Sequence, residues 1–209
     1  MRFSAGEKIV FIGDSITDAG RRQDAPPYGT GYVSLVRAAM LARYPQLELG
    51  IVNAGIGGNT ARDLHARWET DALAEKPHWL SVKIGINDVW RAFANRPDEA
   101  VPLDEYTNTL RALLTRATSG GGTRLILMTP YLIEANRDDP MRRTMEQYGA
   151  AVKGLAVEFD AVCVDTQGAF DTVLAHTPAL FWADDRIHPG LPGHAVLALA
   201  WLRAVGFAL

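Results

Sequence analysis

The sequence predicts an α/β protein, a three-layer α/β/α sandwich around a five-stranded, mostly parallel sheet. Short apolar runs bounded by turn residues alternate with longer segments of helical periodicity, the pattern of parallel strands joined by crossover helices. A helix candidate follows each expected strand, and the expected strand order is of the flavodoxin type. The expected strands are Lys8 to Ile12, Leu47 to Val52, Trp79 to Ile84, Arg124 to Met128 and Ala161 to Val164.

Two segments carry apolar side chains at helical spacing and predict amphipathic helices that lie on the sheet. The first stripe consists of Val33, Val36, Met40 and Leu41. The second stripe consists of Tyr106, Leu110, Leu113, Leu114 and Ala117. The second helix is expected to start near Asp104, and the last helix of the chain to run from about Pro192 to Val205. Thr60 and Asp63 are spaced as a capping pair at the start of another helix.

Length and composition limit the number of domains and the classes of partner. The 209 residues, 48% of them hydrophobic, suit a single domain spanning 1–209. The 21 basic and 24 acidic residues are interspersed, and the net charge of -3 argues against nucleic acid or an anionic membrane as a partner. No apolar stretch approaches the roughly 20 residues that span a bilayer. The N-terminal residues do not resemble a secretory signal, so we expect a cytoplasmic protein.

A serine follows the first expected strand in the block Gly13-Asp14-Ser15-Ile16-Thr17. Ligand sites in such folds lie beyond the carboxyl ends of the strands, which is where this block falls. On its own the block is ordinary turn chemistry. A serine hydroxyl becomes a nucleophile only with a base within hydrogen-bond reach, so a partner is required.

Such a base stands near the end of the chain, in Asp185-Arg186-Ile187-His188-Pro189. The proline disfavours helical geometry at His188, which predicts a loop in which a carboxylate three residues earlier folds back onto the imidazole. One ring nitrogen then meets the carboxylate and the other faces Ser15. Asp184 competes with Asp185 for this orienting role, and a capped surface turn is the alternative interpretation.

Acyl transfer also needs donors where the carbonyl oxygen becomes negative. Glycines before a helix allow the Gly58 N–H to point at a ligand, and the Asn87 amide and the Ser15 N–H supply two further donors. A phosphate loop is the alternative for the glycine segment, but the segment lacks the Lys-Ser or Lys-Thr pair of that motif. Asn87-Asp88 alone would be read as a turn.

The four blocks, in this order, resemble the SGNH hydrolase superfamily, also called the GDSL esterases and lipases, over essentially the whole chain. The resemblance implies the SGNH hydrolase fold, Ser15 as nucleophile, Asp185 and His188 as the rest of the triad, and Ser15, Gly58 and Asn87 as the oxyanion hole. The stretches 85–91 and 139–149 look like the small intracellular acetylxylan esterases of this superfamily. Gly57 replaces a common serine, and Gly190 follows His188-Pro189 where serine or asparagine is frequent.

By this resemblance we expect a serine-dependent esterase that removes acetyl groups from sugar esters, such as acetylated xylo-oligosaccharides, through an acyl-serine intermediate. The expected partner is a small-molecule ester, no cofactor is required, and a homo-oligomer is expected. A general short-chain carboxylesterase or a lysophospholipase-type lipid esterase is the alternative within enzymes. A noncatalytic carbohydrate-binding relative is the alternative outside them.

Four aromatic residues near the ends of expected strands or near the catalytic blocks are candidates for lining the substrate site. Aromatic faces commonly stack on sugar rings, although packing in the core is the other interpretation. The candidates are Trp90, Trp182, Tyr28 and Tyr131.

Other reactive side chains are interpreted structurally. We expect no metal site, because His194 has no helical histidine partner and the segment has no cysteine, and His194 is a satisfied structural residue. Cys163 is expected to be a buried thiol. The Arg142-Arg143 pair is expected on a solvated face or an oligomer contact. Asp14 and Asp88 are expected to hold loop geometry beside the catalytic blocks.

Overall fold

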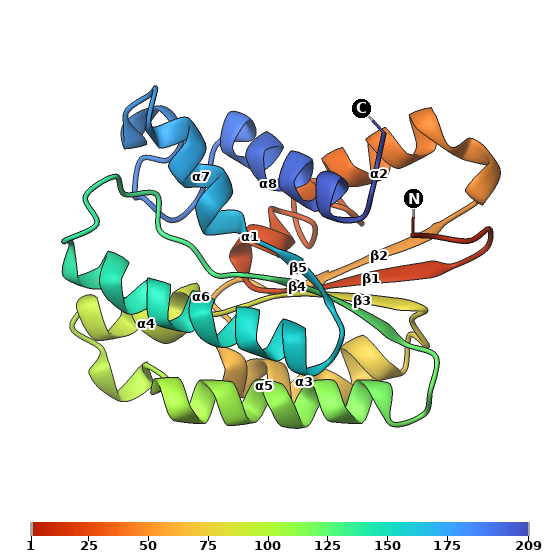
Figure 1. Cartoon of the computed structure of the whole chain (residues 1–209), viewed down its shortest axis with the longest axis horizontal. Coiled ribbons are helices and arrows are strands. Elements are labelled where there is room, and N and C mark those ends of the chain that lie inside the picture. The colour runs from red at the N-terminus through yellow and green to blue at the C-terminus, as the bar shows by residue number, and fades with distance from the viewer. Residues whose placement is uncertain (1, 209) are drawn as a thin grey trace.

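The computed structural model describes residues 2–208 and contains a five-stranded sheet with helices on both faces (Figure 1). The strands are β1 (Lys8–Gly13), β2 (Gly50–Gly55), β3 (Trp79–Lys83), β4 (Arg124–Met128) and β5 (Val162–Val164). All pair in parallel, in the order β2-β1-β3-β4-β5. The predicted fold class is confirmed, and the order is that of flavodoxin.

Helices α2, α7 and α8 cover one face of the sheet, and α3, α5 and α6 cover the other (Figure 1). The helices are α1 (Ser15–Asp18), α2 (Tyr32–Arg43), α3 (Ala61–Trp68), α4 (Ile86–Phe93), α5 (Leu103–Thr118), α6 (Pro140–Glu158), α7 (Thr166–Leu174) and α8 (Leu191–Ala204). Short turns of helix lie at Pro45–Leu47, Glu69–Leu73, Pro97–Glu99 and Ala179–Phe181. No helix within residues 2–208 is both long and apolar enough to cross a bilayer.

The packing of the helices follows the apolar patterns of the sequence. The predicted stripe of α5 is fully buried, from Tyr106 to Ala117. On the other face, the Trp201 ring of α8 packs against Phe11 of β1, and its indole N–H donates to Ser81 of β3. The capping pair at α3 is present as a complete capping box, because the side chains of Thr60 and Asp63 accept from each other's backbone N–H groups. The predicted stripe of α5 and the predicted capping pair of α3 are thus confirmed.

Strand β2 lies three residues later than predicted. The apolar segment that begins at Leu47 enters a helical turn, and Glu48 adopts a left-handed backbone with φ 46° before the strand begins. At the other end, the strand continues through the polar Asn53, whose side-chain amide donates to the carbonyls of Thr17 and Tyr28. A buried polar residue with all its partners breaks the hydrophobic pattern without breaking the strand.

Two apolar positions are wrongly predicted as buried. Leu41 is 40% exposed, because at about 100° per residue it lies at the edge of the stripe formed by Val33, Val36 and Met40. Cys163 is exposed because β5 is a short strand at the sheet edge, and alternation turns its middle side chain away from the face that buries Val162 and Val164.

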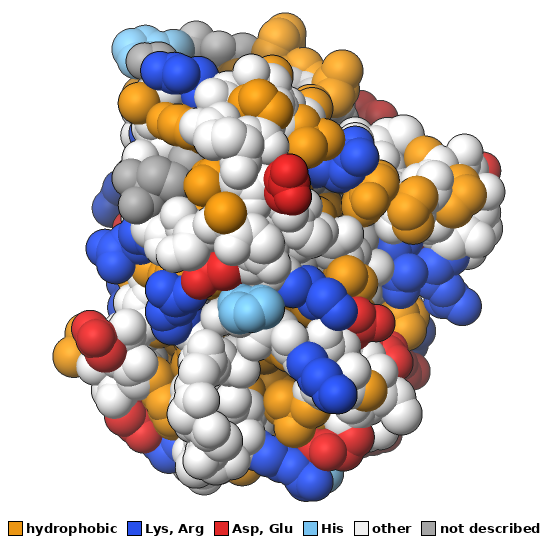
Figure 2. Space-filling model, turned by 90° about the vertical axis from the view of Figure 1, so that its right-hand side faces the viewer, with side chains coloured by type: hydrophobic (Ala, Val, Ile, Leu, Met, Phe, Trp, Pro, Cys, Tyr) orange, Lys and Arg blue, Asp and Glu red, His pale blue; other side chains and the backbone are white. Residues whose placement is uncertain are grey.

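The two ends of the sheet differ in character. Figure 2 views the end at which the strands start, and there Lys and Arg side chains are interspersed with Asp and Glu and with apolar groups. This face therefore offers no stripe of one charge. The opposite end, where the strands finish, carries the residues that the sequence selected for chemistry.

Candidate active site

Ser15 is the first residue of α1, directly after β1. Asp14 is fully buried and caps this short helix, with its Oδ1 accepting from the Ile16 N–H at 3.0 Å. The turn passes very close to the neighbouring strand, because a Cβ on Gly13 would lie 2.1 Å from the Lys83 carbonyl oxygen. Glycine is therefore required at 13, and Asp14 has the geometric role that was predicted.

The loop at 185–188, called the base loop below, contacts this serine although 173 residues separate Ser15 from His188 in the sequence. The Ser15 Oγ lies 2.9 Å from the His188 Nε2, and the His188 Nδ1 lies 2.6 Å from the Asp185 Oδ2. The other oxygen of Asp185 accepts from the backbone N–H groups of Ile187 and His188, at 2.9 and 2.7 Å. The three residues predicted as a triad are thus in a serine–histidine–aspartate arrangement. Asp185, rather than Asp184, holds the ring.

Asp185 is charged in this arrangement. Partial burial raises the pKa of its carboxyl, but hydrogen bonds from the His188 ring and from two backbone N–H groups outweigh that effect, and the pKa lies below its usual value. The carboxylate is therefore present at neutral pH to stabilise a protonated His188.

The glycine segment after β2 lies beside Ser15. A Cβ on Gly57 would be 3.8 Å from the Ser15 Cβ, and Gly58 has a positive φ of 79°, which favours glycine. Asn87, in the first turn of α4, donates its amide to the Asn59 carbonyl at 3.0 Å. Ser15, Gly58 and Asn87 therefore come from the ends of three adjacent strands and meet at one edge of the sheet.

Two neighbouring side chains hold these donors in place. The Asp88 Oδ1 accepts from the Ala61 N–H at 2.8 Å, which fixes the start of α3 against α4. The Arg91 Nη2 donates to the Gly58 carbonyl at 2.6 Å. Burial raises the pKa of Asp88 to about 7, so this carboxyl exchanges its proton near neutral pH. Asp88 holds loop geometry as predicted, whereas the role of Arg91 was not foreseen.

Arg67 is a further residue that sequence reasoning missed. Its guanidinium donates to the Gly13 and Ala54 carbonyls at 2.9 and 2.7 Å, and to the Asn59 side chain at 2.6 Å. One side chain on α3 therefore ties the ends of β1 and β2 to the loop that carries Gly58. No sequence signal identifies it, because these contacts exist only once strands distant in sequence are paired.

The base loop is anchored by Arg186, which lies between Asp185 and His188. Arg186 has a left-handed backbone with φ 66°, a conformation that costs a non-glycine residue about 1 kcal/mol or more. Its side chain forms ion pairs with Glu134 at 2.8 Å and Asp139 at 3.0 Å, and its carbonyl accepts from the Ile133 N–H at 2.9 Å. The strained turn is thus held by contacts to the segment that follows β4.

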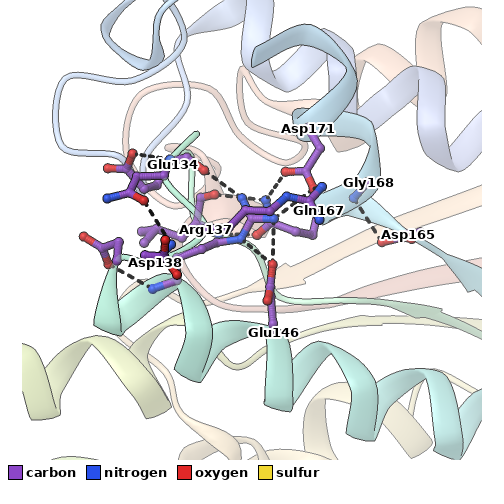
Figure 3. Close-up of polar contacts among 12 residues, drawn as sticks. Glu134, Arg137, Asp138, Glu146, Asp165, Gln167, Gly168 and Asp171 are labelled. Carbon is purple, nitrogen blue, oxygen red and sulfur yellow. Dashed lines mark hydrogen bonds and ion pairs between the residues drawn. The ribbon is translucent and has the colours of Figure 1, made fainter. Parts of the chain in front are cut away.

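That segment is fixed in turn by Arg142, which is only 1% exposed and donates to the Glu134 carbonyl and to Asp171. The prediction of a solvated face or oligomer contact is therefore wrong for Arg142, because helix α6 turns it inward. Figure 3 shows Glu146 of α6 and Asp171 of α7 on opposite sides of this network, and the Arg142 guanidinium donates to both carboxylates. Arg142, Glu146 and Asp171 border a cavity of about 320 Å³.

The four aromatic candidates divide into two groups. Trp90, Trp182 and Tyr28 are half-buried, so each presents part of its surface to solvent. Tyr131 is fully buried, and its hydroxyl donates to the Ile187 carbonyl at 3.2 Å. The prediction of Tyr131 as a substrate contact is wrong, because its ring packs under the base loop instead of facing solvent.

His194 is a structural residue, as predicted. Its Nδ1 accepts from the Tyr32 N–H at 3.2 Å, and burial, together with the charges of Lys83 and His188, lowers its pKa to about 4. The ring is therefore neutral at physiological pH. Within residues 2–208, no three His, Cys, Asp or Glu side chains are grouped so that they could hold a metal ion.

Comparison with known proteins identifies the class. Residues 11–196 match the GDSL-like Lipase/Acylhydrolase family, to which the chain therefore belongs. It is a serine-dependent ester hydrolase, in agreement with the resemblance found in the sequence.

Among its relatives is an acetylxylan esterase of Geobacillus stearothermophilus, 50% identical over 99% of this chain and 97% of that protein. The crystal structure of that esterase, Axe2, superposes with a TM-score of 0.94 at 49% identity and covers 100% of this chain and 98% of the other. A catalytic mutant of Axe2, S15A, superposes with a TM-score of 0.93 at 50% identity, over the same shares. The thioesterase 1/protease 1/lysophospholipase L1 of Escherichia coli K12 is 27% identical over 94% of this chain and 82% of its own.

Proposed function

We propose that this chain removes acetyl groups from sugar esters, acetylated xylo-oligosaccharides in the first place, with Ser15 as nucleophile. The observation that carries the proposal is the contact of 2.9 Å between the Ser15 Oγ and the His188 Nε2, with Asp185 on the other ring nitrogen. Such an arrangement converts a weakly nucleophilic hydroxyl into an attacking group.

The reaction proceeds in two halves. The Ser15 Oγ attacks the ester carbonyl while His188 takes its proton, and the imidazolium is stabilised by the charged Asp185. His188 then protonates the leaving alcohol, which departs and leaves an acyl-Ser15. Water, activated by His188, attacks the acyl carbon, and Ser15 is regenerated as acetate leaves.

The negative oxygen of each tetrahedral intermediate accepts from the Ser15 N–H, the Gly58 N–H and the Asn87 side chain. The turn at Gly58 and the contact of Asn87 with the Asn59 carbonyl support this role, because donors held in advance need no reorganisation during the reaction. Arg91 and Arg67 keep the loop in place through the Gly58 carbonyl and the Asn59 side chain.

The proposed substrate class rests on the activity of a 50% identical relative and on the exposure of the His188 side chain. Acetylxylan esterase is the activity of the 50% identical relative, and Axe2 has a catalytic mutant at a serine numbered 15. His188 is 57% exposed on its side chain, so the reacting groups lie on an open surface that admits the bulky alcohol of a sugar ester. Trp90, Trp182 and Tyr28 are proposed as stacking surfaces for the sugar.

The whole chain, residues 1–209, is proposed to act as one catalytic domain that assembles into a homo-oligomer. Three large apolar side chains before and after the base loop in sequence are exposed, and burying them in a contact between copies would favour assembly. They are Leu180, Phe181 and Leu191. The cytoplasmic location stays a prediction.

The test compares hydrolysis of peracetylated xylose, p-nitrophenyl acetate and p-nitrophenyl octanoate by the wild type and Ser15→Ala. We expect sugar deacetylation and acetate release that disappear in Ser15→Ala, with little turnover of octanoate. A preference for octanoate would favour the lipid or general esterase, a second candidate for which the Escherichia coli thioesterase and lysophospholipase relative speaks. A wild type with no activity on any of the three would favour a noncatalytic carbohydrate-binding protein.

A further inference from the structure

Lys83 is a fully buried lysine below the turn that carries Ser15. It is the last residue of β3, and its backbone is in register with Gly13 of β1, two residues before Ser15. Its side chain is 0% exposed. Strand alternation places it on the same face as Ser81, which accepts from Trp201 of α8. An ammonium group without access to water is expensive, so its surroundings should explain its presence.

Two groups face this ammonium. The Asp14 Oδ2 lies 3.8 Å from the Lys83 Nζ, and the Tyr131 ring centroid lies 4.8 Å from it, within the range of a cation–π contact. Burial lowers the pKa of Lys83, and the Asp14 carboxylate acts in the opposite direction. Both neighbours are themselves fully buried.

Each of these neighbours leads directly to one half of the catalytic pair. Asp14 precedes Ser15 and fixes its turn through the Ile16 N–H. Tyr131 holds the carbonyl of Ile187, the residue before His188, at 3.2 Å. Lys83 thus contacts one residue that fixes the turn of Ser15 and one residue that fixes the loop of His188. Ser15 and His188 themselves lie 173 residues apart in the sequence.

We infer that Lys83 is a positioning residue that aligns Ser15 with His188, by binding Asp14 on one side and the Tyr131 ring on the other. The inference rests on the proposed roles of Ser15 and His188. It adds a group that touches neither substrate nor reacting atom and acts only through these two neighbours.

Stability alone does not account for this lysine. Buried ion pairs are often replaced by apolar residues of similar size without loss of stability, so a methionine would suffice if Lys83 only filled space. The Lys83–Asp14 pair is also too long for a hydrogen bond, at 3.8 Å, which makes it a weak source of folding energy. Placement of the two halves of the site is the function that its contacts do serve.

The test is Lys83→Met in the full-length protein, with Asp14→Asn/Lys83→Met, Tyr131→Phe and Ser15→Ala beside it. We measure kcat and KM for p-nitrophenyl acetate, the rate of covalent labelling by a fluorophosphonate, and the thermal midpoint. The matched control is Ser81→Ala, on the same face of β3, which removes a buried hydrogen bond from Trp201 but contacts neither catalytic segment.

We expect Lys83→Met to lower kcat and the labelling rate at least tenfold, with KM within about twofold of wild type. Asp14→Asn/Lys83→Met should be more active than Lys83→Met, because the asparagine oxygen still caps Ile16 and no uncompensated charge remains. Ser81→Ala should lower the thermal midpoint and leave kcat and labelling unchanged.

A Lys83→Met enzyme within twofold of wild type in kcat and labelling would overturn the inference, as would a loss confined to the thermal midpoint or to KM. If Lys83→Met does not fold, Asp14→Asn/Lys83→Met decides, since it removes the lysine without leaving an unpaired carboxylate: a severalfold loss of labelling relative to wild type supports the inference, and unchanged labelling overturns it. Tyr131→Phe keeps the ring and removes the hydroxyl to Ile187, and it should also lower labelling. Activity retained by Ser15→Ala is a separate result, which would refute the proposed function itself.

Discussion

The two halves of the candidate active site are held in different ways. The nucleophile turn at Gly13–Thr17 and the start of α4 are buried, and close strand packing and a helix cap fix them. The base loop at 185–188 is half exposed, and it is fixed by ion pairs of Arg186 with the segment after β4. The buried half is held by close strand packing and by side chains shielded from solvent, such as Asp14 and Asp88. The exposed half depends on ion pairs that solvent reaches, and it should be the easier one to disturb.

The largest effect is expected within the exposed half itself. Asp185→Ala should lower kcat about ten-thousandfold, because His188 loses the carboxylate that orients its ring and stabilises its charge. Asp184→Ala is the matched control and should stay close to wild type, since His188 bonds to Asp185. Steady-state kinetics with p-nitrophenyl acetate measures both, and a greater loss in Asp184→Ala would show that the wrong carboxylate was chosen.

The buried half should respond next. Asn87→Ala removes one of the three proposed oxyanion donors and should lower kcat about 100- to 1,000-fold with little change in KM. Circular dichroism and the thermal midpoint establish that the variant is folded. An unchanged kcat in folded protein would exclude Asn87 from the oxyanion hole.

Two substitutions at Arg186 are expected to have a smaller effect on kcat, and they distinguish the cost of its left-handed backbone from the contribution of its ion pairs. Arg186→Ala loses both ion pairs and keeps the left-handed backbone, and we expect kcat to fall about tenfold. Arg186→Gly loses the same ion pairs but relieves a backbone cost of about 1 kcal/mol, so it should be about fivefold more active than the alanine variant. Equal activity of the two variants would mean that the φ of 66° carries no cost in this loop.

The smallest effects are expected in the pH dependence of stability. The pKa of Asp88 is raised to about 7, so the folded state holds a proton that the unfolded state releases above about pH 4, and stability falls as pH rises toward 7. The pKa of His194 is lowered to about 4, so its contribution is lost as pH falls from 6.5 toward 4. The two slopes, each about 1.4 kcal/mol per pH unit, oppose each other between pH 4 and 6.5.

Asp88→Asn removes one of the two opposing slopes, because the asparagine keeps an oxygen for the Ala61 N–H and cannot ionise. Urea unfolding at pH 4.5, 5.5 and 6.5 should then show the free energy of unfolding rising with pH in the variant and nearly level in the wild type. Parallel curves for the two proteins would contradict the raised pKa of Asp88.

The contrast between backbone packing and individual side-chain contacts also explains which features the sequence could predict. The fold class and all five strands followed from apolar periodicity. The arrangement of Ser15, His188 and Asp185 followed from short blocks and their resemblance to the SGNH hydrolases. Strand β2 was misplaced because its buried Asn53 looks like a loop residue until its partners Thr17 and Tyr28 are in place. Pattern reasoning assigns polar side chains to the surface, and so it fails where burial is compensated by long-range bonds.

The positioning residues were beyond reach for the same reason. Arg67, Arg91 and Arg186 bond to carbonyls or carboxylates distant in sequence, and an isolated arginine is read as a solvated charge. Tyr131 was misjudged as a sugar contact because its place after β4 suggests the rim of the site, whereas its side chain points beneath the base loop. The direction in which a side chain points is set by tertiary packing. A single sequence does not show that packing.

The most direct test of the account is to treat the protein with an active-site-directed fluorophosphonate and map the adduct by peptide mass spectrometry. The predicted result is one adduct per chain, on the peptide that contains Ser15, formed quickly in wild type, slowly in His188→Ala and not at all in Ser15→Ala. An adduct on another residue, or ester hydrolysis that survives Ser15→Ala, would contradict the assignment of Ser15 as the nucleophile.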